Sequence, residues 1–495
     1  MPSDHFRAVI VGAGFGGIGA AIQLSRLGYD DFVILERESD LGGTWLVNHY
    51  PGLAVDVPTT TYSYFFEPNP NWSRLYSTGT EIKRYADDVA DKYDVRRHMR
   101  FDTNVEGARW DEEAKRWRLT LAGGATVTAD ILITATGFLS QPKLPEIPGI
   151  TEFDGTVIHT ADWDDSFDAS GRRIGIIGTG ATAVQLIPEL AETAADLTVY
   201  QRTPIWVVPK VDFPISESAK RLFRRFPLTQ RVIRGVTDAI YEFFIYTGLR
   251  HRRFLFRRLN IGATDLAKML RFAQVRDRGL RERLTPDYDL GCKRPTFSNS
   301  YYRTFTKPHV HLQDSGIDHI EADGVVAEDG TKNVIDTLVL ATGFDLWEAN
   351  FPAIEIVGRD GRNLGKWWRE TRFQAYQGVS IPYFPNYLSL ASPYAFLGLN
   401  FFNTMEYQMR HMARLFGEMK RRGADTFEVT EEANARYLDR MTELIGDSVF
   451  TVGNCATSRS YYFNPSGEPT LLRPMSTRAA IREASQFPFD DYRFA

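Results

Sequence analysis

Two glycine-rich segments have the residue types and the spacing needed to bind a dinucleotide. The first reads Gly12-x-Gly14-x-x-Gly17, and Glu36 follows it at the end of the next apolar run. Gly12 permits a tight turn, Gly14 lets the backbone approach a pyrophosphate, and Gly17 lets a helix pack closely on a strand. The carboxylate of Glu36 is placed to accept hydrogen bonds from a ribose hydroxyl. This segment predicts a dinucleotide site, with a structural glycine turn as the alternative.

The second segment, Gly178-x-Gly180-x-x-Ala183, repeats the pattern without the acid. Arg202 and Thr203 stand at the end of its next apolar run. A carboxylate there would repel a 2′-phosphate, whereas a guanidinium binds that dianion in a forked geometry. The segment therefore predicts an NADP site, unless Arg202 is an ordinary solvated residue at a strand end. Two sites of different type indicate FAD in the first and NADPH in the second.

Each segment needs a strand, a tight turn and a helix to position it. Apolar runs precede the glycine turns at residues 7–11 and 174–177. A repeated segment, Asp-x-Leu-[Ile/Val]-x-Ala-Thr-Gly-Phe, occurs at 130–138 and 336–344. Each copy is predicted to be a buried strand whose end lets the backbone pass close to a cofactor. The sequence thus predicts an α/β fold with two Rossmann-like dinucleotide-binding domains.

The composition is that of a soluble globular protein. A net charge of −5 gives no global attraction to nucleic acid, so an anionic partner must be bound locally. We expect neither a signal peptide nor a membrane span, because the early apolar run is short and broken by glycines. Cys292 and Cys455 form no CxxC pair, so neither a disulfide framework nor a thiol redox centre is expected. A cytoplasmic location is the resulting expectation.

A third motif lies between the two glycine-rich segments. Residues 153–164 read Phe-Asp-Gly-Thr-Val-Ile-His-Thr-Ala-Asp-Trp-Asp. They match Phe-x-Gly-x-x-x-His-x-x-x-Trp-[Pro/Asp], the fingerprint of type I Baeyer–Villiger monooxygenases. A second signature of that family, Gly-x-Trp followed by Tyr-Pro-Gly-x-x-x-Asp, matches residues 43–56. The chain resembles this family of FAD- and NADPH-dependent flavoproteins over nearly its whole length, and related monooxygenases generally carry Tyr or Phe in place of Trp163.

The resemblance implies insertion of one oxygen atom of O2 next to a ketone carbonyl, giving an ester or lactone through a C4a-peroxyflavin. Such chemistry needs a fixed cation beside the flavin. The family's Lys-Arg segment corresponds to Lys293 and Arg294, so Arg294 is the expected catalytic cation and Lys293 is expected to hold the NADP phosphate. Asp56 is expected to orient Arg294 and modulate its charge. A structural ion pair and a turn-capping carboxylate are the respective alternatives.

The two family signatures assign further roles. Gly43, Thr44 and Trp45 are expected to bind FAD. His159 and Trp163 are expected to anchor a hinge whose closure places the nicotinamide over the flavin. A packed core role is the alternative for His159, and no neighbour has the spacing of a metal ligand.

The C-terminal third is expected to supply a wall of the substrate pocket. A loop followed by an amphipathic helix beginning near Gly398 is predicted, with Tyr394 and Phe396 as pocket residues. A simple core role is the alternative for these aromatic side chains. Tyr461 and Tyr462 stand where the family has a Trp-Tyr pair in a mobile loop, so the contacts of that loop are left open.

The motifs divide the chain into segments. The FAD-binding domain is expected to comprise residues 1–145 and 345–495, and the NADP-binding domain residues 146–209 and 292–344. A helical insertion is expected at 210–291, where basic residues outnumber acidic ones. A solvated helix face explains that excess, with contact to an anionic membrane surface as the less favoured alternative. The aromatic residues of the insertion favour a hydrophobic ketone as substrate.

Three other functions share parts of this pattern. A flavin-containing monooxygenase that oxidises nitrogen or sulfur would need no cation for an anionic adduct. A disulfide reductase has the same two-domain architecture but requires a redox-active cysteine pair near the flavin. A flavin-binding protein with little turnover would differ only in its lack of activity.

Overall fold

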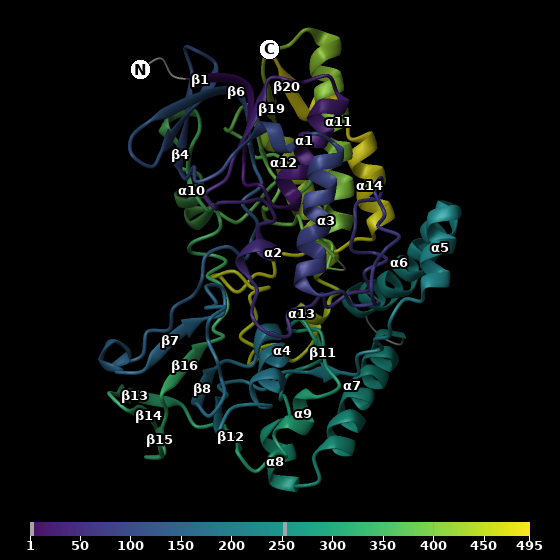
Figure 1. The fold of residues 1–495 in the computed structure, drawn as a ribbon. Helices are drawn as coiled ribbons and strands as arrows, with labels where there is room; N and C mark the ends of the chain where they lie inside the picture. Colours follow the sequence, from purple (N-terminus) through teal and green to yellow (C-terminus); the bar gives the residue numbers. More distant parts are fainter. Residues whose placement is uncertain (1–3, 251–254, 399) are drawn as a thin grey trace.

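A computed structural model describes residues 4–250, 255–398 and 400–495, which form two lobes (Figure 1). The upper lobe in that view contains both ends of the chain, and the lower lobe contains the middle of the sequence. Each lobe is built around its own sheet.

The sheet of the upper lobe has eight strands in the order β17-β4-β5-β6-β1-β2-β3, with β18 also paired to β6. The strands are β1 (Asp4–Val11), β2 (Phe32–Leu35), β3 (Met99–Arg100), β4 (Val105–Asp111), β5 (Arg116–Leu121), β6 (Thr126–Thr134), β17 (Glu355–Val357) and β18 (Tyr387–Ser389). β1 pairs in parallel with β2 and β6, and α1 (Phe15–Arg26) connects β1 to β2. Strands from both ends of the chain therefore share one sheet.

The part of this sheet formed by β6, β1 and β2 is parallel and largely buried on both faces, as expected for parallel strands covered on two sides, whereas β5 pairs antiparallel with β4 and β6. Along β1, Ala8 and Ile10 pack in one hydrophobic cluster, while Val9 and Val11 pack in another. The strand alternates between the two clusters because successive side chains point to opposite faces. The remaining helices and strands of this lobe are α2 (Thr44–Val47), α3 (Gly79–Lys92), α10 (Leu364–Glu370), α11 (Phe401–Arg422), α12 (Glu431–Ile445), α13 (Val449–Val452), α14 (Thr477–Gln486), β19 (Phe427–Val429) and β20 (Tyr492–Phe494).

The lower lobe contains a parallel sheet of five strands in the order β12-β9-β8-β16-β7. Its strands are β7 (Thr156–His159), β8 (Arg173–Ile177), β9 (Asp196–Tyr200), β12 (Val310–Gln313) and β16 (Thr337–Leu340). α4 (Ala181–Leu190) connects β8 to β9, so this lobe repeats the strand-helix-strand unit of the upper one. Smaller elements complete it: β10 (Val207–Val208), β11 (Thr296–Phe297), α9 (Tyr301–Thr304), β13 (Ile317–Glu321), β14 (Gly324–Ala327) and β15 (Lys332–Val334).

The two glycine turns are possible only without side chains. Gly12 has φ +104°, and a Cβ on it would lie 2.7 Å from the carbonyl oxygen of Ala135. Gly178 has φ +121°, and its Cβ would lie 2.4 Å from the carbonyl oxygen of Ala341. Such residues are strongly disfavoured unless they are glycine. Each turn therefore packs against one copy of the repeated Ala-Thr-Gly segment.

The insertion between β10 and β11 is helical and lies along one side of the molecule (Figure 1). Its helices are α5 (Glu217–Arg225), α6 (Pro227–Arg250), α7 (Leu255–Gln274) and α8 (Arg278–Arg283). The expectation of helices at 210–291 thus agrees with α5 to α8, while residues 251–254 of the insertion lie outside the described residues. The helix predicted to begin near Gly398 is α11, whose N-cap Asn400 accepts a hydrogen bond from the N–H of Asn403.

Candidate functional site

A cavity of about 1760 Å³ is lined by both glycine turns. Pockets for one small ligand are typically about 300–1,000 Å³, so this cavity has room for more than one. Its wall includes Gly12 and Gly14 from the upper lobe, Gly178 and Gly180 from the lower lobe, and the segments 135–137 and 341–343. The two repeats seen in the sequence therefore meet at one cavity.

Glu36 closes the first glycine turn from the end of β2. Its Oε2 accepts a hydrogen bond from the N–H of Ala13 at 2.6 Å, and its Oε1 accepts one from the N–H of Glu38 at 3.0 Å. Burial raises the pKa of the Glu36 carboxyl, and these two hydrogen bonds oppose the rise. Since Glu36 also lines the cavity, its carboxylate is in place to accept ribose hydroxyls.

The segment containing Gly43, Thr44 and Trp45 lies against the first turn and lines the cavity. A Cβ on Gly43, which has φ +55°, would lie 3.1 Å from Cα of Gly14. Trp45 donates a hydrogen bond from Nε1 to the hydroxyl of Tyr62 at 3.1 Å. The two backbones therefore approach closely at the point where a pyrophosphate would bind.

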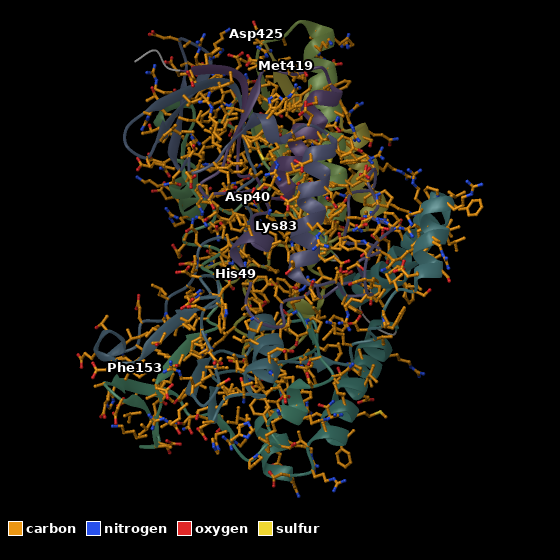
Figure 2. All side chains as sticks on the ribbon, in the orientation of Figure 1. Asp40, His49, Lys83, Phe153, Met419 and Asp425 are labelled. Carbon is orange, nitrogen blue, oxygen red and sulfur yellow. A yellow bond between two sulfur atoms is a disulfide. The ribbon has the colours of Figure 1, made fainter. Side chains whose placement is uncertain are left out.

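An ion pair at the base of α3 holds the loop that leads into this segment. Figure 2 shows Asp40 and Lys83 beside one another, and Lys83 Nζ lies 2.8 Å from Asp40 Oδ2. Gly42, with φ +123°, passes under Lys83, since a Cβ there would lie 2.7 Å from the lysine Cδ. Helix α3 thus fixes the loop that presents Gly43.

Arg294 and Asp56 form a two-pronged ion pair on the cavity wall. Arg294 Nε donates to Asp56 Oδ2 at 2.6 Å, and Nη2 donates to Oδ1 at 3.0 Å. Burial alone would lower the pKa of the guanidinium, but the charge and hydrogen bonds of Asp56 raise it well above its usual range. Arg294 is therefore a permanent, oriented cation.

The two partners come from different parts of the chain. Arg294 precedes β11, which pairs in parallel with β10. Asp56 follows the loop that contains Ala54. Gln185 of α4 holds this loop in place, because its Nε2 donates to the carbonyl oxygen of Ala54 at 2.9 Å. Tyr50 in the same loop donates its hydroxyl to Gln185 Oε1 at 3.1 Å. The ion pair consequently depends on contact between the two lobes.

A group of four residues forms a cationic region on the cavity wall, and it includes Lys293, which directly precedes Arg294. Arg202, Thr203 and Lys293 line the cavity together with Arg459. Burial, followed by the charge of Arg202, lowers the pKa of the Lys293 ammonium to about 8. Burial, followed by the charge of Arg459, also lowers the pKa of Arg202. Throughout the described part of the chain, no acidic partner pairs with any of these three cations, an arrangement suited to a phosphate.

Sequence analysis did not single out Arg459. It stands in the loop noted for Tyr461 and Tyr462, and a single basic residue there has no pattern that marks it. The loop as a whole reaches the site, since both tyrosines contribute to the raised pKa of Arg294 and Tyr461 lines the cavity.

His159 is the last residue of β7, and hydrogen bonds relate it to the segments that follow β16 and β6. Its Nδ1 accepts from the N–H of Ala161 at 3.1 Å, and its Nε2 lies 3.3 Å from the hydroxyl of Thr342. That hydroxyl donates in turn to the carbonyl oxygen of Lys143. Burial lowers the pKa of His159, which favours the neutral ring that this chain of hydrogen bonds requires. Trp163 is buried in the core of the lower lobe, with its ring centroid 5.8 Å from that of Phe167.

The other predicted site residues take different positions. Phe396 lines the cavity, with its ring centroid 5.4 Å from that of Phe138. Tyr394 is 1% exposed and lies in the core of the upper lobe, outside the cavity lining. Gly17 and Ala183 also lie behind the cavity, where they allow α1 and α4 to pack on their strands.

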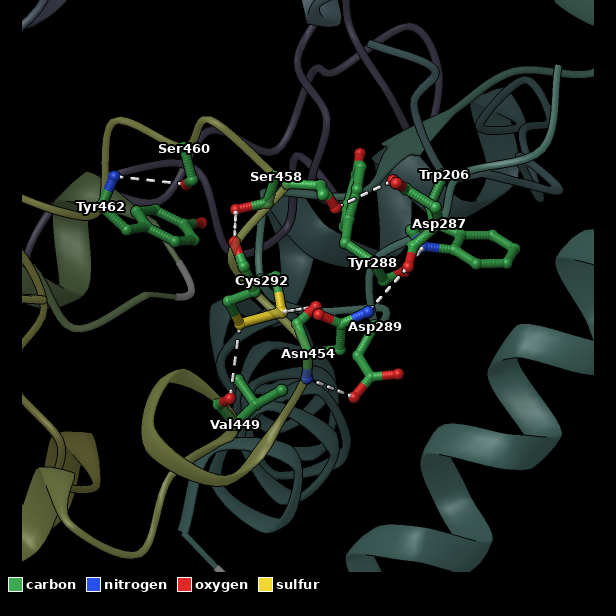
Figure 3. Close-up of a disulfide and its surroundings, with 12 residues drawn as sticks. Trp206, Asp287, Tyr288, Asp289, Cys292, Val449, Asn454, Ser458, Ser460 and Tyr462 are labelled. Carbon is green, nitrogen blue, oxygen red and sulfur yellow. Dashed lines mark hydrogen bonds between the residues drawn. A yellow bond between two sulfur atoms is a disulfide. The ribbon is translucent and has the colours of Figure 1, made fainter. Parts of the chain in front are cut away.

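Cys292 and Cys455 form a disulfide (Figure 3), so the expectation of no disulfide framework is wrong for this pair. The contacts that unite them are long-range: Asp289 donates its N–H to the carbonyl oxygen of Asn454, and Asn454 donates its N–H to Asp289 Oδ2. The pair packs with Trp206 in a separate cluster and does not line the cavity. It therefore lacks the placement beside the glycine turns that a disulfide reductase requires.

Comparison with known proteins gives a family match over the first half of the chain. Residues 6–241 match the model described as pyridine nucleotide-disulphide oxidoreductase. A curated relative named Baeyer-Villiger monooxygenase, from Streptomyces coelicolor, is 38% identical over 494 residues, which is 99% of this chain and 93% of that protein.

Solved structures are similar over the whole chain. A closed crystal structure of cyclohexanone monooxygenase has a TM-score of 0.88 at 28% identity and covers 100% of this chain and 99% of that one. The structure of OTEMO in complex with FAD and NADP has a TM-score of 0.86 at 27% identity and covers 100% of both chains. Within the described ranges, every helix is too short or too polar to cross a membrane.

Proposed function

The chain belongs to the Baeyer–Villiger monooxygenase family, and we propose that it converts a hydrophobic ketone to an ester or lactone, with Arg294 as the catalytic cation. It is an FAD- and NADPH-dependent flavoprotein monooxygenase, so the predicted family, α/β fold and cofactors are confirmed. The observation that carries the assignment of Arg294 is its two-pronged pair with Asp56, on the wall of the cavity that both glycine turns line.

The chain's own residues fit the two cofactors. Gly14 and Glu36 would hold the pyrophosphate and a ribose of FAD, with Gly43 closing that side. A Cβ on Gly180 would meet nothing within 4 Å, so its backbone is open to a second pyrophosphate at the start of α4. Bound FAD, reduced by NADPH, supplies the activation of O2.

We assign the cationic region to the 2′-phosphate of NADPH. Arg202, Lys293 and Arg459 provide three positive charges with no acidic neighbour among the described residues, and a dianion would relieve their mutual repulsion. Thr203 is held at this point, because its carbonyl oxygen accepts a hydrogen bond from the Thr179 hydroxyl at 2.7 Å. Thr179 follows Gly178, so this hydrogen bond joins the cationic region to the second glycine turn.

Arg294 has the geometry to stabilise negative charge that develops on the substrate oxygen. Asp56 accepts hydrogen bonds from Nε and Nη2, whereas Nη1 lies 3.5 Å from the carbonyl oxygen of Gly398. The N–H groups that Asp56 does not occupy, those of Nη1 among them, are the ones that can face an oxyanion. A preorganised donor of this kind typically lowers the barrier by about 3–4 kcal/mol, or roughly 10²–10³ in rate.

The substrate pocket supports a hydrophobic ketone. The aromatic residues on the cavity wall are Phe15, Trp45, Tyr62, Phe138, Tyr200, Phe344, Trp347, Phe396, Phe401, Tyr461 and Phe463. Six of these eleven lie in the C-terminal third, Phe396 among them. Burial of apolar substrate surface against them favours binding.

The test compares Arg294→Ala with wild-type protein on a cyclic ketone and on an aryl methyl sulfide. Ester formation should fall roughly 10²–10³-fold, because the charged adduct loses its cation. Sulfide oxidation should fall only a few-fold, because it develops no such anion. Two control measurements are made on the same variant: its FAD content and the rate of anaerobic flavin reduction by NADPH. Both should change little.

Two results would contradict the assignment. Equal loss of ketone and sulfide oxidation would move the role of Arg294 to cofactor binding or folding. Survival of both reactions would show that ketone oxidation does not need Arg294, and its assignment as the catalytic cation would fall. Arg294→Lys separates charge from geometry, since lysine keeps the charge but cannot make the two-pronged contact with Asp56.

A further inference from the structure

The exposed apolar side chains of the molecule are concentrated in the helical insertion. Of the eighteen large apolar side chains that are exposed in the described residues, fourteen lie between Val211 and Phe272. The helices that carry most of them, α5, α6 and α7, lie along one side of the molecule, in teal in Figure 1. Concentration of this kind marks an interaction surface, whereas isolated exposed apolar residues are ordinary.

Helix α6 has the reverse of the usual burial pattern. Gln230 and Arg234 are 2% and 6% exposed, whereas Val232, Val236 and Ile240 are 57%, 54% and 50% exposed. The three apolar residues are spaced four apart, so they form one stripe along the helix. A helix that packs only on its own protein would turn this stripe inward.

Hydrogen bonds to the upper lobe hold α6 in this orientation. Arg234 donates from Nη1 to the carbonyl oxygen of Ser63 at 2.8 Å and from Nη2 to that of Thr61 at 3.1 Å. Gln230 donates from Nε2 to the carbonyl oxygen of Asn69. Rotating the helix to bury its apolar stripe would expose these carbonyl groups and break the bonds. The outward apolar stripe is therefore built into the fold.

Helix α7 shows the same inversion. Leu266, Met269 and Phe272 are 49%, 67% and 67% exposed. Arg271, in contrast, is 5% exposed and lies over the ring of Trp206, with 5.8 Å between its Cζ and the ring centroid. Two neighbouring helices thus direct cations inward and apolar side chains outward.

The charge around this surface decides what can cover it. The exposed charged side chains described on α5, α6 and α7 are six basic ones, Arg221, Arg224, Arg225, Arg231, Arg258 and Lys268, against two acids, Glu217 and Asp265. A second copy of the chain would bring arginines against arginines, which is unfavourable. An anionic lipid surface complements both features, since its headgroups attract the arginines and its acyl boundary accepts the apolar stripe.

We propose that α5, α6 and α7 dock this protein on the surface of a bilayer that contains anionic lipid. The helices lie on the bilayer without crossing it, in agreement with the absence of a spanning helix in the described ranges. Docking would hold the protein at the phase in which a hydrophobic substrate is concentrated. The inference is independent of the ketone chemistry of the active site.

The test uses the FAD-loaded full chain and sedimentation with lipid vesicles. Vesicles of phosphatidylcholine alone are compared with vesicles that also contain phosphatidylglycerol, at low and at high salt. The protein should bind the anionic vesicles at low salt, bind neutral vesicles much less, and be released by high salt. Absence of binding to anionic vesicles at low salt would overturn the proposal.

Two variants locate the docking surface. Val232→Gln/Val236→Gln should weaken binding at least about tenfold, because two apolar side chains no longer enter the acyl boundary. Arg225→Gln/Arg231→Gln should also weaken it about tenfold or more, since each arginine near an anionic surface contributes about a fivefold increase. Val157→Gln/Val334→Gln is the matched control, because these exposed valines lie on the lower-lobe strands β7 and β15.

The outcomes are distinguishable. Loss of vesicle binding in both insertion variants, with the control unchanged, supports docking on lipid. Vesicle binding that all variants retain equally places the contact elsewhere and overturns the proposal. Sedimentation velocity adds a further outcome: a dimer of the wild-type protein that the valine variant converts to a monomer would show that a second copy covers α6. Flavin content checks that each variant is folded.

Discussion

The disulfide between Cys292 and Cys455 joins the segment of Lys293 and Arg294 to the segment of Arg459. Cys292 immediately precedes Lys293 and Arg294, and Cys455 stands four residues before Arg459. One segment comes from the lower lobe and the other from the C-terminal loop, so the bond fixes their distance across 163 residues of sequence. The disulfide is thus placed to keep Lys293 and Arg459 of the cationic region close together.

Removal of this bond should loosen the C-terminal loop. We expect Cys455→Ser to raise the KM for NADPH several-fold and to lower the melting temperature, with a smaller effect on kcat. A closed loop of this length contributes about 5 kcal/mol to stability in the chain-entropy model. The measurements are steady-state kinetics with NADPH and a thermal unfolding curve.

A dithiol reductant provides the control for the cysteine variant. It should reproduce both effects in the wild-type protein and change nothing in Cys455→Ser. Titration of thiols in the unreduced, denatured protein should find none. Two titratable thiols would show that the bond is open under those conditions, as expected in a reducing compartment.

Asp56→Asn should uncouple NADPH oxidation from product formation. The asparagine has the shape of aspartate but removes the charge that raises the pKa of Arg294 and the stronger pair of hydrogen bonds. Charge-assisted hydrogen bonds contribute about 1.5–3 kcal/mol, so ester formation should fall roughly 10- to 150-fold while hydrogen peroxide release rises. The measurement is the ratio of ester to NADPH consumed.

The surface pair of Asp91 with Arg96, 2.8 Å apart, supplies a matched control. Asp91→Asn also removes one carboxylate from an arginine, but it lies on α3 and outside the cavity lining. Its coupling ratio should equal that of the wild-type protein. A ratio that stays at the wild-type value in Asp56→Asn would restrict Asp56 to a structural role.

The glycine turns could be predicted because their requirement is local. Gly12 and Gly178 have positive φ angles, and each turn leaves no room for a Cβ. The short motif in the sequence therefore carries the physical constraint itself. Two copies of such a motif, each between a strand and a helix, were enough to predict two Rossmann-like domains.

Features that depend on distant contacts could not be predicted in this way. Cys292 and Cys455 meet through the hydrogen bonds between Asp289 and Asn454, which no local spacing reveals. Arg459 lies in the cationic region because its loop, which is distant in sequence, returns to the lower lobe. Tyr394 has the same aromatic character as Phe396 but lies in the core, since pocket and core positions have similar composition.

Arg202→Gln should weaken the preference for NADPH over NADH. The loss of charge-assisted hydrogen bonds to the 2′-phosphate costs about 1.5–3 kcal/mol, which corresponds to a rise in the KM for NADPH of roughly 10- to 150-fold. NADH lacks that phosphate, so its KM should change little. The same experiment with Arg459→Gln tests whether the C-terminal loop contributes to the region. An equal change for both nucleotides would assign either arginine to general binding or to folding.

Lys293 should make NADPH binding depend on pH near 8. Its pKa is lowered to about 8 by burial and then by the charge of Arg202, so the free enzyme carries the ammonium below that pH and loses it above. Binding of the 2′-phosphate favours the charged form, and the KM for NADPH should therefore rise as pH increases through 8, by up to about tenfold per pH unit.

Two variants and NADH isolate this effect of Lys293. Lys293→Arg retains its charge throughout the range, so its KM for NADPH should stay low and show no rise near pH 8. Lys293→Met should have a high KM at every pH. For NADH the wild-type profile should be flat, because no phosphate faces the ammonium. A rise near pH 8 that persists in Lys293→Arg would mean that another group titrates, and Lys293 would then have no part in the pH dependence.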